Sequence, residues 1–380
     1  MDIKDLRQNI NEIDSCITEL FNKRMGESLE VAKYKIENNM PVLDKTRERE
    51  LLERVSNMSK PEISNYTRML YSDILSLSRT YQYKIINGAS PITETIQNVI
   101  ESTPRLFPEK ATVACQGVEG AYSQHACDRI FKYPHINYYE TWDNVFDSVS
   151  NGQCDYGILP IENSTAGSVN KVYDLLKEYN CYIVKSVRLK IDHSLLAKKG
   201  TSLSQIKEIF SHEQALNQCS DFISSLPNVK VTVVKNTAEA AKFVSESPRD
   251  DVASIASADC CELYGLQELE YAVQNVKNNY TRFICISKDM QIFPGADRSS
   301  IMLTTHHTPG ALYSILAKFN SHGINLIKLE SRPIPEKNFE FMFYFDIEAS
   351  VYSPELLSLF DELHAENSSF IYFGSYSEII

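Results

Sequence analysis

The chain has 380 residues, of which 43% are hydrophobic and 23% charged, and its formal net charge is −12. This size and composition are typical of a soluble protein with two or three domains. The negative charge, without a stretch of five or six consecutive basic residues, argues against a nucleic-acid or anionic-membrane partner, so we expect an anionic substrate to meet a local cluster of cations.

The nine cysteines are scattered without a C-x-x-C pair, which predicts reduced thiols and neither a zinc site nor a disulfide framework. The first residues lack a basic segment followed by an apolar one, and no apolar run approaches the length of a membrane span. We therefore expect a cytoplasmic protein without a metal.

Residues 3 to 38 carry apolar side chains at alternating spacings of four and three, which predicts a long helix with a heptad seam. The seam consists of Ile3, Leu6, Ile10, Ile13, Ile17 and Leu20. Two further helical patterns follow, one after Pro41 and one from Ile63 to Ile85.

Charged residues fall where this helical pattern expects apolar side chains. Arg24 takes the next core position of the heptad, and Arg7 and Lys35 flank the seam. A buried guanidinium costs several kcal/mol unless carboxylates pair with it, and these can come from protein or ligand. The alternative for Arg7 and Lys35 is a solvated flanking position.

The second and third helices add polar groups on the faces that carry their apolar residues. Asp44, Arg47 and Glu48 belong to the second helix, and Ser78 and Gln82 to the third. The alternative is a salt-bridged coiled coil in which Asp44 only caps the second helix.

Residues 87 to 110 predict a linker with a short helix near residues 94 to 101, because glycine and proline interrupt the pattern. Short β-rich runs then alternate with helical stretches, which predicts an α/β region with largely parallel sheets. The predicted strands are 112–115, 156–161, 181–187, 209–211, 229–234, 252–256 and 283–287.

Several loops of this region carry polar residues at strand ends, where α/β sheets build sites. They include Gly117 to Ser123, Pro160 to Ser168 and Ser211 to Cys219, and Thr281-Arg282 stands at the start of the last strand. The first loop is neither G-x-G-x-x-G nor a Walker loop. It fits an anion at a helix N-terminus or a plain strand-to-helix turn, and His212 fits a general base or a polar helix start.

After a second linker at residues 288 to 298, the pattern predicts strand, helix, two strands, helix and strand. That order is typical of a small ferredoxin-like sandwich. Together with the helical and α/β regions, it predicts a multidomain protein.

The helical segment resembles the all-helical chorismate mutases. The matching motifs are Leu6-Arg7, Lys23-Arg24, Lys35, P-V-x-D-x-x-R-E-x-x-L-L from Pro41 to Leu52, and S-x-x-x-Q from Ser78 to Gln82. Chorismate rearranges to prephenate without a nucleophile or metal, so cations and donors suffice to hold the dicarboxylate and stabilise the ether oxygen.

The resemblance implies a role for each matching residue. Arg7, from the partner chain of an interlocked dimer, and Arg24 would bind the carboxylates, and Lys35 and Gln82 would donate to the ether oxygen. Asp44 and Glu48 would hold the ring hydroxyl. Arg47 and Ser78 would complete the chorismate site.

The three α/β loops, Ile191 to Leu196 and Thr281-Arg282-Phe283 resemble the prephenate dehydratases, whose two-lobed fold is similar to periplasmic binding proteins. Prephenate loses carbon dioxide and its ring hydroxyl together, so it needs a proton donor at the leaving hydroxyl, for which we expect Thr281. The resemblance places these residues at the prephenate: Ser123, Glu162, Asn163, Ser164, Ser211, Gln218, Thr281 and Arg282.

The C-terminal segment resembles ACT regulatory domains, which bind phenylalanine at a subunit interface. The resemblance implies an allosteric site at Gly310, Ala311, Leu312, Glu330, Ser331 and Arg332. Gly310 permits a close approach of the backbone to the amino acid.

Together these resemblances are those of a bifunctional chorismate mutase/prephenate dehydratase with an ACT domain. They imply an all-α domain at 1–88, a two-lobed α/β domain at 110–288 and an α+β ACT domain at 298–376. We expect a homodimer or larger homo-oligomer, no cofactor, chorismate and prephenate as substrates, and L-phenylalanine as inhibitor. The alternatives are a dehydratase with a merely dimerising helical arm, or a non-enzymatic amino-acid sensor.

Overall fold

The computed structural model describes residues 2–38, 40–86, 91–305, 308–334, 341–367 and 369–380. The chain divides into two compact units. One comprises Met1–Asn98, Leu303–Tyr344 and Tyr352–Phe370, and the other comprises Val99–Met302, Phe345–Val351 and Ile371–Ile380.

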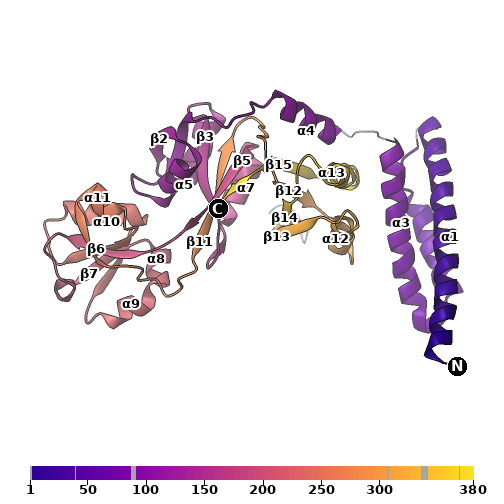
Figure 1. The fold of residues 1–380 in the computed structure, drawn as a ribbon, viewed down its shortest axis with the longest axis horizontal. Helices are drawn as coiled ribbons and strands as arrows, with labels where there is room; N and C mark the ends of the chain where they lie inside the picture. Colours follow the sequence, from indigo (N-terminus) through magenta and orange to yellow (C-terminus); the bar gives the residue numbers. More distant parts are fainter. Residues whose placement is uncertain (1, 39, 87–90, 306–307, 335–340, 368) are drawn as a thin grey trace. The chain divides into compact units, whose positions relative to one another are not determined.

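The N-terminal region of the first unit consists of helices, as the sequence predicts. They are α1 (Ile3–Glu37), α2 (Lys45–Met58), the short 3₁₀ turn η1 (Pro61–Ile63) and α3 (Ser64–Ile86). Helix α3 packs against both α1 and α2, and Figure 1 shows α1 and α3 side by side. Helix α4 (Pro91–Ser102) follows residues 87–90, which lie outside the described ranges.

The second unit contains a sheet with the strand order β16-β5-β11-β3-β1-β2, to which β4 is added beside β3. Strands β2 and β3 run parallel to β1, whereas β11 runs antiparallel to both of its neighbours. The strands are β1 (Lys110–Gln116), β2 (Tyr133–Tyr139), β3 (Tyr156–Asn163), β4 (Gly167–Ser168), β5 (Tyr182–Lys190), β11 (Tyr280–Ser287) and β16 (Glu378–Ile379).

A further sheet of the same unit has the order β10-β6-β9-β7-β8. Here β6 runs antiparallel to β9 and β10, and β7 runs parallel to β8 and β9. Its strands are β6 (Ser194–Lys198), β7 (Glu208–Ser211), β8 (Lys230–Val233), β9 (Val252–Ala256) and β10 (Leu266–Glu270). Both sheets are mixed, so the expectation of largely parallel sheets was wrong.

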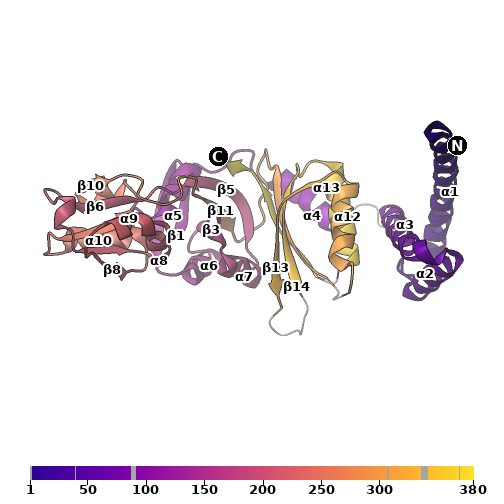
Figure 2. The ribbon, with the colours of Figure 1, turned by 90° about the horizontal axis from the view of Figure 1, so that it is seen from below.

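Helices cover both sheets of this α/β region. They are α5 (Tyr122–Ile130), α6 (Trp142–Ser150), α7 (Asn170–Tyr179), α8 (Glu213–Gln218), α9 (Ser220–Ser225), α10 (Thr237–Glu246) and α11 (Cys260–Tyr264), with the turn η2 (Leu203–Gln205). Figures 1 and 2 show the sheet of β6 and β7 in a separate lobe from the sheet of β3, β5 and β11. Residues 191–193 and 271–279 join the two lobes, which gives the predicted two-lobed arrangement.

The C-terminal region follows the predicted order of strands and helices. Its elements are β12 (Arg298–Thr304), α12 (Ala311–Ser321), β13 (Asn325–Pro333), β14 (Phe341–Glu348), α13 (Pro354–Glu366) and β15 (Phe370–Tyr376). The strand order is β13-β14-β12-β15, so β13 is an edge strand. After β15 the chain continues into β16, which pairs with β5.

No helix in the described ranges combines the length and the apolar character needed to cross a bilayer. The domain boundaries predicted from the sequence stay predictions.

Candidate active sites

Arg24 lies at the interface of α1 and α3, as its heptad position predicts. Its Nη1 donates to Ser78 Oγ at 2.9 Å, and the hydroxyls of Ser78 and Ser28 are 2.6 Å apart. Burial lowers the pKa of Arg24, and the charge of Tyr71 acts in the opposite direction. Among the described residues, this cation has a hydroxyl partner and no carboxylate within hydrogen-bond distance, which suits a ligand carboxylate.

Lys35, Asp44 and Glu48 lie near one another. The pKa of Lys35 is lowered, because burial outweighs the opposing charges of Asp44 and Glu48. Lys35 Nζ donates to the backbone oxygen of Val42. Asp44 also caps α2, since its Oδ1 accepts from the backbone N–H of Arg47 at 3.0 Å. The structure thus shows the capping role that the sequence left open.

The remaining predicted mutase residues differ in their surroundings. Gln82 is buried, and its Oε1 has no hydrogen-bond partner among the described residues. Glu48 forms an ion pair with Arg79, a residue that the motif did not include. Arg47 is exposed and lies 3.8 Å from Glu50, and Arg7 is exposed on α1.

The heptad seam of α1 is exposed in the single chain. Between 43% and 66% of each residue is accessible along the seam, which consists of Ile3, Leu6, Ile10, Ile13, Ile17 and Leu20. Six large apolar side chains on one stripe are typical of a surface that another helix covers. The exposed seam therefore lies on the helix that also carries the exposed Arg7.

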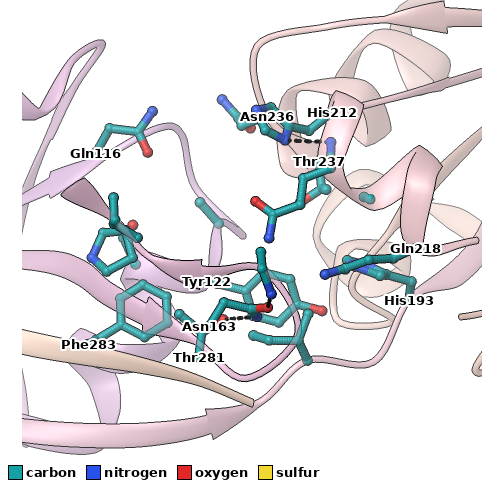
Figure 3. A pocket seen from close by; sticks show the side chains of 18 of the residues that line it. Gln116, Tyr122, Asn163, His193, His212, Gln218, Asn236, Thr237, Thr281 and Phe283 are labelled. Carbon is teal, nitrogen blue, oxygen red and sulfur yellow. Dashed lines mark hydrogen bonds between the residues drawn. The ribbon is translucent and has the colours of Figure 1, made fainter. Parts of the chain in front are cut away.

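A pocket of about 440 Å³ lies in the α/β region (Figure 3). Four residues predicted from the sequence line it: Ser123, Asn163, Gln218 and Thr281. Other lining residues were not predicted as ligands, and the polar and aromatic ones are Gln116, Tyr122, Trp142, Ser168, His193, His212, Gln214, Lys235, Asn236, Thr237 and Phe283. Tyr122, Ser168, His193, His212, Gln214 and Phe283 lie within segments that resemble the prephenate dehydratases, whereas Gln116, Trp142, Lys235, Asn236 and Thr237 lie outside those segments.

The pocket meets the N-terminal ends of several helices. The cap or first-turn residues that line it are Ala121 to Ser123 of α5, Trp142 of α6, Val169 of α7, His212 and Gln214 of α8, and Asn236 and Thr237 of α10. Helix N-termini carry partial positive charge and free N–H groups, and so attract anions.

Among these lining residues, all within the described ranges, Lys235 carries the single formal charge, and its Nζ forms an ion pair with Glu140. The cluster of cations expected around an anionic substrate is therefore absent from the part of this pocket that the structure describes. Helix ends and neutral donors take its place.

Thr281 lies at the start of β11 with a fixed partner. Asn163 Nδ2 donates to Thr281 Oγ1 at 2.9 Å, while Asn163 Oδ1 accepts from the backbone N–H groups of Thr165 and Ala166. Because backbone N–H groups only donate, the Asn163 amide cannot be turned over. Thr281 Oγ1 is thus an acceptor toward Asn163, which leaves its own proton for a ligand.

Glu162, Ser164 and Ser211 were predicted at the prephenate but do not line the pocket. Ser211 Oγ donates to the backbone oxygen of Ile255 at 2.6 Å, within the second sheet. Ser164 Oγ accepts from the backbone N–H of Tyr280 at 2.9 Å, so it secures the loop to β11.

Arg282 also lies away from the pocket, because neighbouring residues of a strand point to opposite faces. Its Nη2 pairs with Asp346 of β14, and Glu162 Oε2 is 3.5 Å away. Only 6% of either the Arg282 or the Asp346 side chain is exposed. Burial acts to lower the pKa of Arg282, but the charge and hydrogen bond of Asp346, together with the charges of Tyr376 and Tyr173, outweigh it, so the pKa is raised. In this structure Arg282 binds a protein carboxylate.

Two histidines line the pocket in different ways. Burial lowers the pKa of both His193 and His212. His212 Nδ1 accepts from the backbone N–H of Gln214 at 3.3 Å, so His212 caps α8. His193 Nε2 lies 3.1 Å from Gln218 Oε1.

Two sequence families match the chain, one in each of these regions. The family described as chorismate mutase type II matches residues 6–83, and the family described as prephenate dehydratase matches residues 113–291. A relative from Escherichia coli (strain K12), a bifunctional chorismate mutase/prephenate dehydratase, is 32% identical over 378 residues. The match covers 98% of this chain and 95% of the relative.

The chain belongs to the bifunctional chorismate mutase/prephenate dehydratase family.

Solved structures resemble the dehydratase part of this family member. A prephenate dehydratase from Arthrobacter aurescens in complex with L-Phe has a TM-score of 0.63 and 26% identity, over 70% of this chain and 90% of that chain. GqqA, described as a novel type of quorum-quenching acylase, has a TM-score of 0.64 and 30% identity, over 70% of this chain and 97% of that one.

The predicted regulatory residues of this family member lie on two elements. Gly310 precedes α12 with φ of 85°, a conformation that favours glycine, and Ala311 and Leu312 begin the helix. Glu330, Ser331 and Arg332 lie on the edge strand β13, where Ser331 is more exposed than the other two.

Among the described residues, no three histidine, cysteine or acidic side chains are grouped closely enough to hold a metal ion.

Proposed function

We propose that the helical region carries the chorismate mutase activity of this family and the α/β pocket its prephenate dehydratase activity. The chain would then catalyse two consecutive steps of L-phenylalanine biosynthesis. The observation that carries the dehydratase assignment is the orientation of Asn163, which leaves the Thr281 proton for a ligand of the pocket.

In the dehydratase reaction, the bond between the ring and the departing carboxylate breaks, and its electrons form the aromatic ring as the hydroxyl leaves. The leaving oxygen needs a hydrogen-bond donor, and Thr281 supplies it. A positioned donor of this kind contributes roughly 10²–10⁴-fold. The helix N-termini hold the two carboxylates of prephenate, so a single lysine among the lining residues suffices.

In the mutase reaction, Arg24 binds a carboxylate of chorismate, with its guanidinium held in place by Ser78. Lys35 and Gln82 donate to the ether oxygen. Gln82 can do so if its amide presents the NH₂ group to that oxygen. Asp44 and Glu48 bind the ring hydroxyl, and Arg47 completes the shell. The reaction proceeds through orientation and charge stabilisation alone.

The working form is a homodimer or a larger homo-oligomer in which the α1 seam of one chain covers that of another. The exposed seam supports this, because burying each large apolar side chain is worth about 1.5–3 kcal/mol. Arg7 then reaches the chorismate site of the partner. The nine cysteines, all within the described ranges, are free thiols, which supports a cytoplasmic location.

L-Phenylalanine inhibits the enzyme through the C-terminal sheet. The L-Phe complex of the related dehydratase supports this, as does Gly310 at the start of α12. We expect Glu330→Ala or Arg332→Ala to weaken inhibition at saturating prephenate, and unchanged inhibition would remove these residues from the effector site.

The test is product analysis after chorismate is supplied to purified enzyme without added metal or nucleotide. Wild type should form phenylpyruvate, and Thr281→Ala should accumulate prephenate at the wild-type mutase rate. Thr281→Ser, which keeps the hydroxyl, should recover much of the dehydratase rate. Equal loss of both activities in Thr281→Ala, or full dehydratase activity in it, would contradict the assignment.

A further inference from the structure

Backbone N–H groups fix which side-chain atoms donate and which accept in the hydrogen bonds around Gln218. The backbone N–H groups of Thr165 and Ala166 fix the oxygen of the Asn163 amide. Its Nδ2 therefore donates to Asn279 Oδ1 at 2.8 Å as well as to Thr281. Asn279 is 1% exposed, and its amide must present the oxygen to Asn163.

The orientation of the Asn279 amide in turn fixes the donor and acceptor roles of Gln218. With its oxygen engaged by Asn163, Asn279 donates through Nδ2 to Gln218 Oε1 at 3.1 Å. Gln218 Nε2 in turn donates to Thr165 Oγ1 at 2.9 Å, and Thr165 Oγ1 donates to Asn163 Oδ1 at 2.7 Å. Each group in this ring of hydrogen bonds has a single consistent role.

His193 adds a second donor to the same Gln218 oxygen. Since Gln218 Oε1 is an acceptor, His193 Nε2 at 3.1 Å carries the proton. His193 is 3% exposed, and its Nδ1 has no hydrogen-bond partner among the described residues. The hydrogen bond that the ring does make is therefore the one to Gln218, which lies beside it in Figure 3.

His193 and Asn279 occupy the two segments that join the lobes. Backbone hydrogen bonds join the two segments. The N–H of Ile191 donates to the backbone oxygen of Asn279, and the N–H of Val273 donates to the backbone oxygen of His193, both at 2.8 Å. Gln218 comes from the lobe of the second sheet, at the end of α8. The two segments that join the lobes thus hold Gln218, a pocket residue that belongs to one lobe.

We propose that Asn279 and His193 are positioning residues of the dehydratase site, which hold the Gln218 oxygen away from the ligand and present its NH₂ group as a donor. This rests on the proposed dehydratase function. One Nε2 hydrogen is used by Thr165, and the other is free for a carboxylate of the substrate. A reversed amide would turn a carbonyl oxygen toward an anion.

The experiment compares Asn279→Asp and Asn279→Leu with Asn278→Asp. Asn278 is an exposed neighbour, so its change introduces the same charge outside the ring of hydrogen bonds. The aspartate in Asn279→Asp would present acceptors to Gln218, and the leucine in Asn279→Leu would remove the donor without adding charge. For both we expect a roughly 5–150-fold fall in kcat/KM for prephenate, carried mainly by KM, with Asn278→Asp near wild type.

The decisive comparison repeats these changes in a Gln218→Ala background. If Asn279 acts through the Gln218 amide, Asn279→Asp and Asn279→Leu should lower kcat/KM no further there. His193→Leu should behave in the same way, and it serves if an Asn279 variant fails to fold. Mutase rate and melting temperature, measured on the same full-length samples, report folding.

An equal further loss in the Gln218→Ala background would overturn the proposal, since the residues would then act independently of Gln218. Normal kinetics in Asn279→Leu beside impaired Asn279→Asp would also overturn it, because charge alone would explain the loss. Wild-type enzyme that leaves prephenate unchanged would instead contradict the dehydratase function.

Discussion

The two candidate sites differ in how much of each a single chain completes. In the α/β pocket, the donors around Thr281 are already oriented by backbone N–H groups of the same chain. In the helical region, Arg24 and Ser78 are in contact, but the apolar seam of α1 and the side of Arg7 remain uncovered. The pocket is lined by residues of one chain, whereas the three helices leave an apolar stripe exposed.

This difference predicts which perturbations each activity tolerates. Association of chains should govern the mutase and leave the dehydratase largely unchanged. Substitutions of buried residues in the α/β region should lower the free energy of unfolding more than they weaken the association of chains.

The largest expected effect comes from Ile13→Lys in the exposed seam. Two lysines per dimer would remove about 3–6 kcal/mol of apolar burial from the association free energy. The variant should dissociate in analytical ultracentrifugation and lose mutase activity as it is diluted, while dehydratase activity persists. Asn9→Lys, at an exposed polar position of the same helix, is the control. A monomeric Ile13→Lys with full mutase activity would show that one chain completes the helical site.

The next effect concerns Asp346, the buried partner of Arg282. Asp346→Asn leaves the guanidinium without its closest carboxylate, which typically costs about 3–5 kcal/mol of unfolding free energy. Urea denaturation should show this loss, while kcat of the folded enzyme changes little, since Arg282 lies away from the pocket. Asp289→Asn, an exposed aspartate, should be neutral. A variant of normal stability with a raised KM for prephenate would return Arg282 to the substrate site.

A smaller effect is expected from Arg24→Ala, because losing a hydrogen-bonded cation at a substrate carboxylate typically costs about 1.5–3 kcal/mol, or roughly 10–150-fold in kcat/KM. The mutase rate should fall by this factor and the dehydratase rate should not change, in assays started from chorismate and from prephenate. Arg49→Ala removes an exposed arginine of the helical region as a control. Parallel loss of both rates would mean that the regions are not functionally separate.

The sequence indicated the long helices and the buried strands well, because their periodicities report burial directly. It missed β2, whose tyrosines and proline lie on a half-exposed edge, and β10, whose residues are mainly polar and partly exposed. It also missed β6, although that strand is buried. The mixed direction of the sheets depends on long-range pairing, which a local pattern does not encode.

Asn163 and Thr281 were predicted as site residues from the sequence, and both line the pocket, while their roles stay predictions. Arg282 and Ser211 do not line the pocket, since alternation along β11 places Arg282 on the face opposite to Thr281 and Ser211 bonds to a strand backbone. Their roles stay predictions. His193 lies within the segment Ile191 to Leu196 that resembles the prephenate dehydratases, but no role was predicted for it or for Asn279. Their partner Gln218 is distant in sequence, so only the folded chain reveals their hydrogen bonds.

The smallest effect, confined to the α/β region, comes from Glu208 at the start of β7. Hydrogen bonds from Lys230 and Thr232 at 2.7 Å and from Arg249 lower its pKa to about 2. A carboxyl pKa lower in the folded than in the unfolded state, where it is about 4.3, stabilises the fold above that pH and loses this contribution as pH falls toward 2. Its cations are largely exposed, so each pair is worth at most about 1 kcal/mol. Glu208→Gln should therefore lower the urea midpoint slightly at pH 7, and the gap to wild type should close by about pH 2 to 3. A gap that stays constant with pH would show that packing of the side chain, and not its charge, holds β7 and β8 together.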